Sequence, residues 1–146
     1  MPHDPDSSDP HAKRAPTPRV ILPEGWKRPR GYSNGMAARG EFLAVAGMIG
    51  WDENEVLVAD DFVGQFRQAL SNVVATVVAA GGQPSSLISL TIYVTDKNEY
   101  IASLREVGQA YRELLQKHFP AMALVQVAAL LEPRAKVEIQ GLAVLP

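Results

Sequence analysis

Two segments with the periodicity of amphipathic helices, separated by one β-like run, most restrict how this chain can fold. In residues 61–80 the apolar side chains recur every three or four positions: Phe62, Phe66, Leu70, Val73 and Val77. In residues 98–118 they do so again: Tyr100, Leu104, Val107, Tyr111 and Leu114. This spacing predicts two helices that each bury one stripe. The polar face of the first helix would carry Gln65, Arg67, Gln68, Ser71 and Asn72.

Local signals fix where these helices begin and end. Asp60 or Asp61 suits the N-cap of the first helix, because a carboxylate oxygen accepts the free amide hydrogens there. Gly81-Gly82 supplies the positive-φ stop that commonly ends a helix. Asp96 and Glu99 have the spacing of a capping box before the second helix, with Asp in place of the usual Ser or Thr.

The remaining apolar runs predict strands, and together they indicate an α+β fold. The expected strands or extended segments are residues 20–22, 32–38, 41–49, 87–94, 122–131 and 136–145, with a turn-and-return segment over 51–58. Residues 41–49 are nearly continuously apolar, so we expect them to be buried on both faces. One sheet with two helices on one face would satisfy both helical stripes. Self-association would then cover the opposite sheet face.

Composition divides the chain into a tail and one domain. Residues 1–18 are rich in Pro, Ser, Asp and basic residues, which predicts a disordered N-terminal tail, and residues 19–146 form the domain. His3 and His11 lie in the tail, where fixed metal geometry is not expected. The 146 residues are 47% hydrophobic, which is ample for one core.

Charge and residue usage exclude several classes of function. The formal net charge is −2, which argues against a nucleic-acid or anionic-membrane surface. There is no cysteine, so disulfides and cysteine metal sites are excluded, in keeping with a cytoplasmic protein. No apolar run approaches the roughly 20 residues of a transmembrane helix. Motifs for nucleotides, zinc hydrolysis or a serine nucleophile are missing, and we expect no cofactor and no metal.

Several blocks of the sequence resemble the Rid family (reactive intermediate deaminases, also YjgF or RutC-like). The matching blocks are 31–33, 42–49, 65–73, 79–81, 93–96, 119–121, 125–128 and 136–139, in the family's order and spacing over about residues 31–145. The resemblance implies a chorismate-mutase-like α+β domain and a homotrimer with ligand clefts between subunits. Its best-known members hydrolyse short-lived enamines and imines, such as 2-aminoacrylate, to oxo acids and ammonia.

Two residues match family positions in the cleft. Glu138 corresponds to the cleft glutamate, and a carboxylate can position or deprotonate a water that attacks an imine carbon. The alternative is a solvated strand carboxylate paired with Lys136 or Arg134. Tyr32 corresponds to a tyrosine near the cleft mouth, where its hydroxyl could hold a substrate carboxylate or the attacking water. The alternative is a half-buried aromatic with its hydroxyl at the surface.

Met122 departs from the family pattern. Typical deaminases of the family have an arginine after Phe-Pro-Ala that grips the substrate carboxylate, whereas this motif continues with Met122. A thioether cannot bind a carboxylate, so 2-aminoacrylate is not expected to be a good substrate. Ala46, Met48, Leu124 and Gly108 also replace polar residues of many members. The alternative for Met122 is an ordinary core or cleft-wall residue.

These departures predict an apolar cleft for a bulkier or aromatic-derived ligand. We expect its wall to include Ala46, Gly47, Met48, Trp51, Gly108, Tyr111, Met122 and Leu124. Trp51 could stack on the ligand or serve only in packing. Arg134, Arg105 and Arg39 are candidates for a relocated anion clamp, although each could be a plain surface cation.

Three functions follow for comparison. The first is a divergent enamine or imine hydrolase in which Glu138 directs water and Tyr32 holds a polar group. The second is a non-catalytic small-molecule binder or regulator, because fold does not fix function. The third is an endoribonuclease or translation inhibitor, an older family label. The negative net charge argues against this third function, and so does the presence of only one histidine, His118, in the folded part.

Overall fold

The structure, a computed structural model, describes residues 18–146. Its elements, in chain order, are β1 (Arg19–Ile21), β2 (Gly35–Ala37), β3 (Glu41–Met48), α1 (Phe62–Ala79), the short 3₁₀ helix η1 (Pro84–Ser86), β4 (Leu87–Val94), α2 (Lys97–Ala102), α3 (Leu104–Leu115), β5 (Ala121–Gln126) and β6 (Val137–Leu145). The expected disordered tail lies outside the described residues except for Pro18, and so do His3 and His11.

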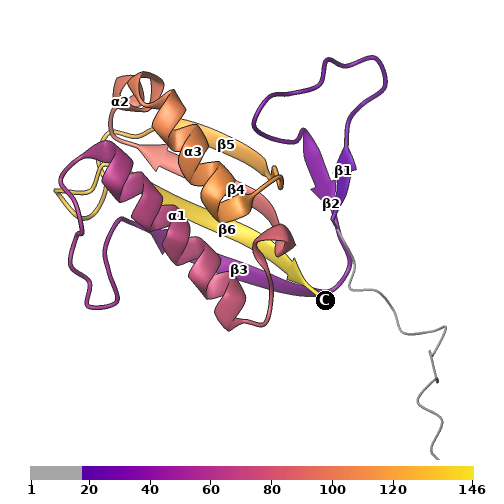
Figure 1. The fold of residues 1–146 in the computed structure, drawn as a ribbon, viewed down its shortest axis with the longest axis horizontal. Helices are drawn as coiled ribbons and strands as arrows, with labels where there is room; N and C mark the ends of the chain where they lie inside the picture. Colours follow the sequence, from indigo (N-terminus) through magenta and orange to yellow (C-terminus); the bar gives the residue numbers. More distant parts are fainter. Residues whose placement is uncertain (1–17) are drawn as a thin grey trace, which may run out of the picture.

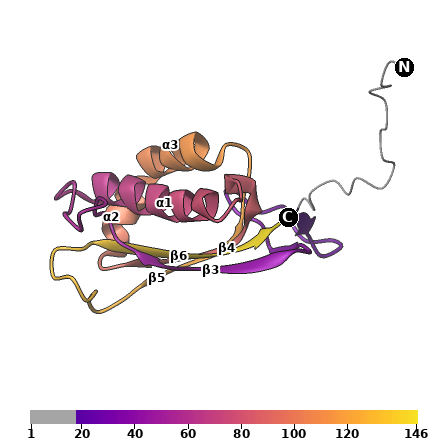
Figure 2. The same cartoon turned by 90° about the horizontal axis from the view of Figure 1, so that it is seen from below.

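The main sheet has the strand order β3-β6-β4-β5 (Figure 1). β6 is antiparallel to both β3 and β4, whereas β4 and β5 are parallel. A parallel pair needs a crossover connection, which α2 and α3 provide. β1 and β2 form a separate antiparallel pair. α1, α2 and α3 all lie on one side of the main sheet (Figure 2), which confirms the α+β prediction of a sheet with its helices on one face.

The core lies between the helices and this covered face of the sheet. Alternate residues of the two central strands are buried there: Leu90, Ile92 and Val94 of β4, and Val137, Ile139 and Ala143 of β6. They meet the predicted stripe of α1, in which all five apolar residues are buried. We call the other side of the sheet, which no helix of residues 18–146 covers, the open face.

The predicted ends of α1 are confirmed. Asp61 is its N-cap and accepts a hydrogen bond from the Gly64 amide at 3.0 Å. Gly81 follows the last turn with φ of +92°, a conformation that glycine adopts without steric cost. The second predicted helix is observed as two helices, α2 and α3, which are separated at Ser103.

The break at Ser103 changes which residues the second helical stripe buries. The Ser103 amide donates to the Tyr100 carbonyl, a hydrogen bond that closes a tight 3₁₀-type turn at the end of α2. α3 begins after this turn with an N-terminus of its own. Leu104, expected in the buried stripe, is 54% exposed as a result. Asp96 caps α2 as predicted, but Glu99 does not complete a capping box. Its carboxylate instead accepts from Lys136 Nζ at 2.7 Å.

Gln65 is a second correction, because it lies in the core rather than on the polar face of α1. Its side chain is fully buried. Nε2 donates to the carbonyls of Ala59 and Arg134, each at 3.1 Å, and Oε1 accepts from the Lys136 amide at 2.8 Å. Three buried hydrogen bonds compensate for placing an amide in the core. They tie the segment between β5 and β6 to the helix layer.

Three predicted strands differ from those observed. β3 is not buried on both faces within the chain, since Phe42 is 64% exposed on the open face. The predicted strand 122–131 ends at Gln126, and residues beyond Val127 form a loop. In residues 32–38 only Gly35–Ala37 pairs as a strand. The turn-and-return segment is confirmed: Trp51 bridges Leu57, and Asp52 Oδ1 accepts from the amides of Asn54 and Val56.

Candidate functional site

Glu138 lies on the open face of β6, partly exposed. Its neighbours Val137 and Ile139 point into the core, because side chains of a strand alternate between the two faces. Tyr93 of β4 is its cross-strand partner. The Tyr93 hydroxyl donates to Gln140 Oε1 at 2.8 Å, so Tyr93, Glu138 and Gln140 form one polar group on this face.

A β-bulge in β3 places Gly47 against Glu138. Val45 pairs with Gly141 and Met48 pairs with Ile139, so two residues of β3, Ala46 and Gly47, stand opposite Gln140 alone. A Cβ atom on residue 47 would lie 2.8 Å from the Glu138 carboxyl carbon. The carboxylate therefore rests across Gly47, and only glycine leaves it that space.

The Glu138 carboxylate is not neutralised by the cations that sequence reasoning offered as partners. Lys136 pairs with Glu99 and Arg134 pairs with Asp60, each at 2.7 Å. Within residues 18–146 no side chain or amide donates a hydrogen bond to Glu138, and no cation lies within ion-pair distance. Its oxygens are therefore free to accept a proton or a hydrogen bond from water.

Met122 and Leu124 lie on the opposite side of the sheet from Glu138. Both pack against the core cluster from β5. The Tyr111 hydroxyl of α3 donates to Met122 Sδ at 3.8 Å. Burial raises the pKa of Tyr111 well above its ordinary value, and the charge and hydrogen bonding of Tyr100 raise that pKa further. Met122 thus belongs to an apolar layer beneath α3, and within one chain it does not line the surface that carries Glu138.

The other predicted site residues are distributed over both faces. Ala46 and Gly47 lie in the bulge beside Glu138, whereas Met48 packs against the core. Asn72 Nδ2 holds the main chain at Trp51 by donating to the Trp51 carbonyl at 2.8 Å. Gly108 lies on α3, where Arg112 is the nearest side chain. Arg134 forms its ion pair with Asp60, so it is not an unpaired anion clamp.

Tyr32 lies at the far end of the sheet from Glu138. Ser33 beside it bridges to Ala121 at the start of β5, where its amide donates to the Pro120 carbonyl at 3.2 Å. From there the register runs through Ser89 to Leu142, four residues from Glu138. Three strand spacings and four residues separate the Ser33 and Glu138 backbones by roughly 19 Å. Tyr32 and Glu138 of one chain are therefore not in contact with each other.

Sequence reasoning missed Tyr93 and Gln140, which the fold places beside Glu138. The signal for Gln140 was present, because residues two apart on a strand share a face. Tyr93 could be found only from the register between β4 and β6. Among residues 18–146 no cluster of three or more metal-ligating side chains is present. No helix of that part has the length and apolar character that a membrane crossing requires.

Comparison with known proteins places the chain in a family. A family model described as Endoribonuclease L-PSP matches residues 26–145. The 2-iminobutanoate/2-iminopropanoate deaminase of Salmonella typhimurium is 34% identical over 108 residues, covering 72% of this chain and 80% of that protein. A RutC family protein of Pyrococcus horikoshii is 36% identical over 113 residues, covering 76% of this chain and 86% of that protein.

Solved structures agree with this assignment. YyfB of Yersinia pestis, a protein of the conserved Rid family, superposes with a TM-score of 0.78 at 30% identity, covering 88% of this chain and 99% of that one. The TdcF protein of E. coli with bound serine superposes with a TM-score of 0.62 at 28% identity, covering 88% and 99%. The chain therefore belongs to the Endoribonuclease L-PSP family, the group of the Rid, YjgF and RutC proteins.

Proposed function

We propose that this protein is a deaminase that hydrolyses imines, and enamines after their protonation to imines, to oxo compounds and ammonia. The observation that carries the proposal is the unpaired Glu138 carboxylate, held across Gly47 on the open face. Relatives of the family give it support, since the Salmonella protein and a goat protein at 34% identity are both named 2-iminobutanoate/2-iminopropanoate deaminase.

Glu138 would act as the general base. A water bound to its carboxylate attacks the carbon of a protonated imine, and the carboxylate takes the proton that the water loses. The proton then passes to the nitrogen of the resulting carbinolamine. The carbon–nitrogen bond breaks and ammonia leaves as the carboxylate takes the hydroxyl proton and the carbon–oxygen double bond forms; the carboxylate then passes this proton to the ammonia, which departs as ammonium. The protonated imine and water thus yield an oxo compound and ammonium, with the carboxylate restored.

The substrate would be larger than 2-iminopropanoate, and aromatic or otherwise apolar. No cationic side chain within residues 18–146 lies beside Glu138, and the position after Phe119-Pro120-Ala121 is Met122. A charge-assisted hydrogen bond to a carboxylate contributes about 1.5–3 kcal/mol, which a thioether does not supply. An apolar body must therefore contribute more of the binding free energy.

The site would be completed by other copies of the chain. The backbone beside Tyr32 is roughly 19 Å from that of Glu138, so we propose that the tyrosine that holds the substrate comes from a neighbouring copy. The open face also presents apolar side chains that a second copy could bury: Phe42, Ala44, Val125 and Leu142. The family resemblance implies three copies, and we propose a homotrimer with clefts between its subunits.

A non-catalytic small-molecule binder is the second candidate. The observation that favours it is the same methionine, because Met122 packs beneath Tyr111 and leaves no guanidinium to orient a small oxo-acid imine. Ribonuclease activity has less support. His118 is the only histidine of residues 18–146, and its Nε2 lies 2.6 Å from the Leu87 carbonyl oxygen, which it can only donate to.

An ammonia-release assay tests the proposal. Imines of pyruvate, of longer oxo acids and of aromatic oxo acids are generated enzymatically, and release is scored against the spontaneous rate for each. We expect acceleration that grows with the size of the apolar group. Equal or greater acceleration of 2-iminopropanoate would contradict the proposed substrate class. No acceleration, together with a ligand-dependent rise of Tm, would favour the binding protein.

A further inference from the structure

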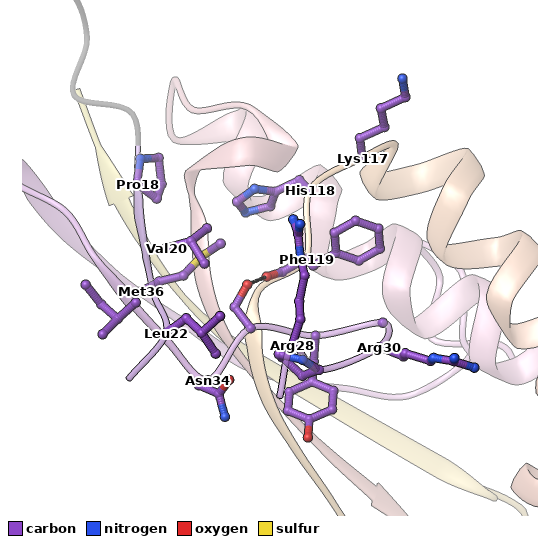
Figure 3. Close-up of a pocket in the computed structure, with 15 residues that line it drawn as sticks. Pro18, Val20, Leu22, Arg28, Arg30, Asn34, Met36, Lys117, His118 and Phe119 are labelled. Atoms are coloured by element: carbon purple, nitrogen blue, oxygen red, sulfur yellow. Dashed lines mark hydrogen bonds between the residues drawn. The ribbon is translucent and has the colours of Figure 1, made fainter. Parts of the chain in front are cut away.

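A cavity of about 760 Å³ lies between the β1–β2 pair with its connecting loop and the segment that joins α3 to β5 (Figure 3). Its size is that of a site for a small organic molecule. Ser33 fixes the two walls together: its Oγ donates to the Phe119 carbonyl at 2.6 Å, and its amide donates to the Pro120 carbonyl. The cavity is therefore bounded by hydrogen-bonded backbone on both sides.

The charge of this cavity has one sign. Among residues 18–146, Arg28, Arg30 and Lys117 line it beside the imidazole of His118, and no aspartate or glutamate does. None of the three ion pairs formed within residues 18–146 involves these cations. Arg28 points toward His118 and Phe119, whereas Arg30 and Lys117 extend away from the centre (Figure 3). Arg28 is thus the cation placed to meet a bound anion, and the other two add a positive rim.

Apart from Ser33 and Asn34, most of the remaining lining is apolar. Four large hydrophobic side chains of the lining are exposed to solvent: Val20, Leu22, Tyr32 and Phe119. Exposed apolar side chains gathered in one concave place mark a ligand or partner surface. A neutral apolar ligand would leave the guanidinium of Arg28 without a partner. An inorganic anion would leave the apolar side chains of the lining exposed to water. A molecule with an apolar body and one carboxylate satisfies both.

We propose that this cavity is a binding site for a small carboxylate with an aromatic or aliphatic body, whose carboxylate pairs with the Arg28 guanidinium. The planar guanidinium fits a carboxylate through two parallel hydrogen bonds. The body of the ligand packs against Val20, Leu22 and Phe119. The site goes beyond the proposed deaminase function because binding at Arg28 needs neither Glu138 nor hydrolysis, although Tyr32, which lines the cavity, also belongs to the proposed cleft between copies.

An NMR titration of the full chain with 4-phenylbutanoate tests the site, with 4-phenylbutanamide as the uncharged probe of equal size. The variant is Arg28→Gln, which keeps length and hydrogen-bonding capacity but removes the charge. The matched control is Lys97→Gln, which removes an exposed cation from the first turn of α2, outside the cavity lining. Circular dichroism of each variant reports whether its fold is retained.

We expect the carboxylate to bind the wild-type chain and to shift amide signals of residues 20–34 and 117–120. Loss of one charge-assisted pair weakens binding by about tenfold or more. Arg28→Gln should show that loss, Lys97→Gln should not, and the amide should bind the wild-type chain as weakly as the carboxylate binds Arg28→Gln. The proposal is overturned by equal affinities of the two probes for the wild-type chain, by an unchanged affinity in a folded Arg28→Gln, or by shifts confined to other residues.

Discussion

The two faces of the main sheet are built from the same strands but differ in burial and in polarity. The covered face is apolar and closed, with Val137 and Ile139 fully buried beneath α1. The open face carries Glu138 between those two residues, together with Tyr93 and Gln140. Alternation along one strand therefore separates the residues that hold the fold from those that can do chemistry. A substitution should affect stability or function according to its face.

The largest expected difference is in stability. Replacing Ile139 with Ala should lower the free energy of unfolding by about 2–5 kcal/mol, because it leaves a cavity in a close-packed core. Leu142→Ala, on the open face of the same strand, should cost less in the isolated chain. Urea denaturation at low protein concentration measures both. Equal losses would show that the faces are not distinct in packing.

Assembly gives the next test, because the open face should be the one that copies of the chain bury. Phe42→Asp places a charge on that face and should dissociate the proposed trimer, since an unpaired carboxylate is costly to bury. Light scattering during size-exclusion chromatography measures the mass. Val78→Asp, at an exposed valine of α1, is the control and should leave the mass unchanged. A wild-type monomer, or an unchanged mass in Phe42→Asp, would contradict the proposal.

A substitution at Gly47 in the β-bulge should lower turnover far more than it lowers the free energy of unfolding. In Gly47→Ala the new Cβ displaces the end of the Glu138 side chain, a flexible group that can move at little cost. We expect turnover to fall about tenfold, the effect of roughly 1.4 kcal/mol on the barrier, with the unfolding free energy changed by less. Gly35→Ala, where the nearest atom is 3.4 Å away, serves as the control. Unchanged turnover would mean that the carboxylate position is not critical.

The covered face should also affect how the free energy of unfolding changes with pH in alkaline solution. Burial raises the pKa of Tyr111, so the folded chain keeps the phenol proton after the unfolded chain has released it. Stability from this group is therefore present below about pH 10 and lost as pH rises further, by up to about 1.4 kcal/mol per pH unit. Tyr111→Phe should lack that component of the slope. Identical slopes above pH 10 in both chains would contradict the shift.

Sequence patterns predicted the elements of the fold well where the interactions that form an element lie within one short segment. The stripe of α1 and its Asp61 cap follow from side-chain spacing and unpaired amides, and both are observed. Gln65 could not be placed this way, because an amide is polar in any pattern. It is buried only because the Ala59 carbonyl before α1 meets it together with the Arg134 carbonyl and the Lys136 amide of the segment between β5 and β6. The break at Ser103 was not predicted either, because the apolar spacing of the second helix continues through it.

The candidate site shows the same limit. The position of Glu138 on a strand was predicted, and its alternation with core residues assigns it to a face. Whether Met122 shares that face depends on how β5 sits in the sheet, and the observed register turns Met122 toward Tyr111. The freedom of the Glu138 carboxylate depends on Asp60 and Glu99, distant in sequence, which pair with the neighbouring cations Arg134 and Lys136. Long-range partners of this kind leave no trace in local spacing.

The most direct test of the central claim is ammonia release by Glu138→Gln, measured with the imine that the wild-type protein hydrolyses fastest. The amide keeps the shape of the side chain but cannot take a proton, so turnover should fall by about 10²–10⁴-fold. Thermal unfolding should be nearly unchanged, because the residue lies on the open face. Glu132→Gln, in the loop before β6, should retain full activity. Turnover by Glu138→Gln at the wild-type rate, with its fold intact, would remove this carboxylate from the mechanism.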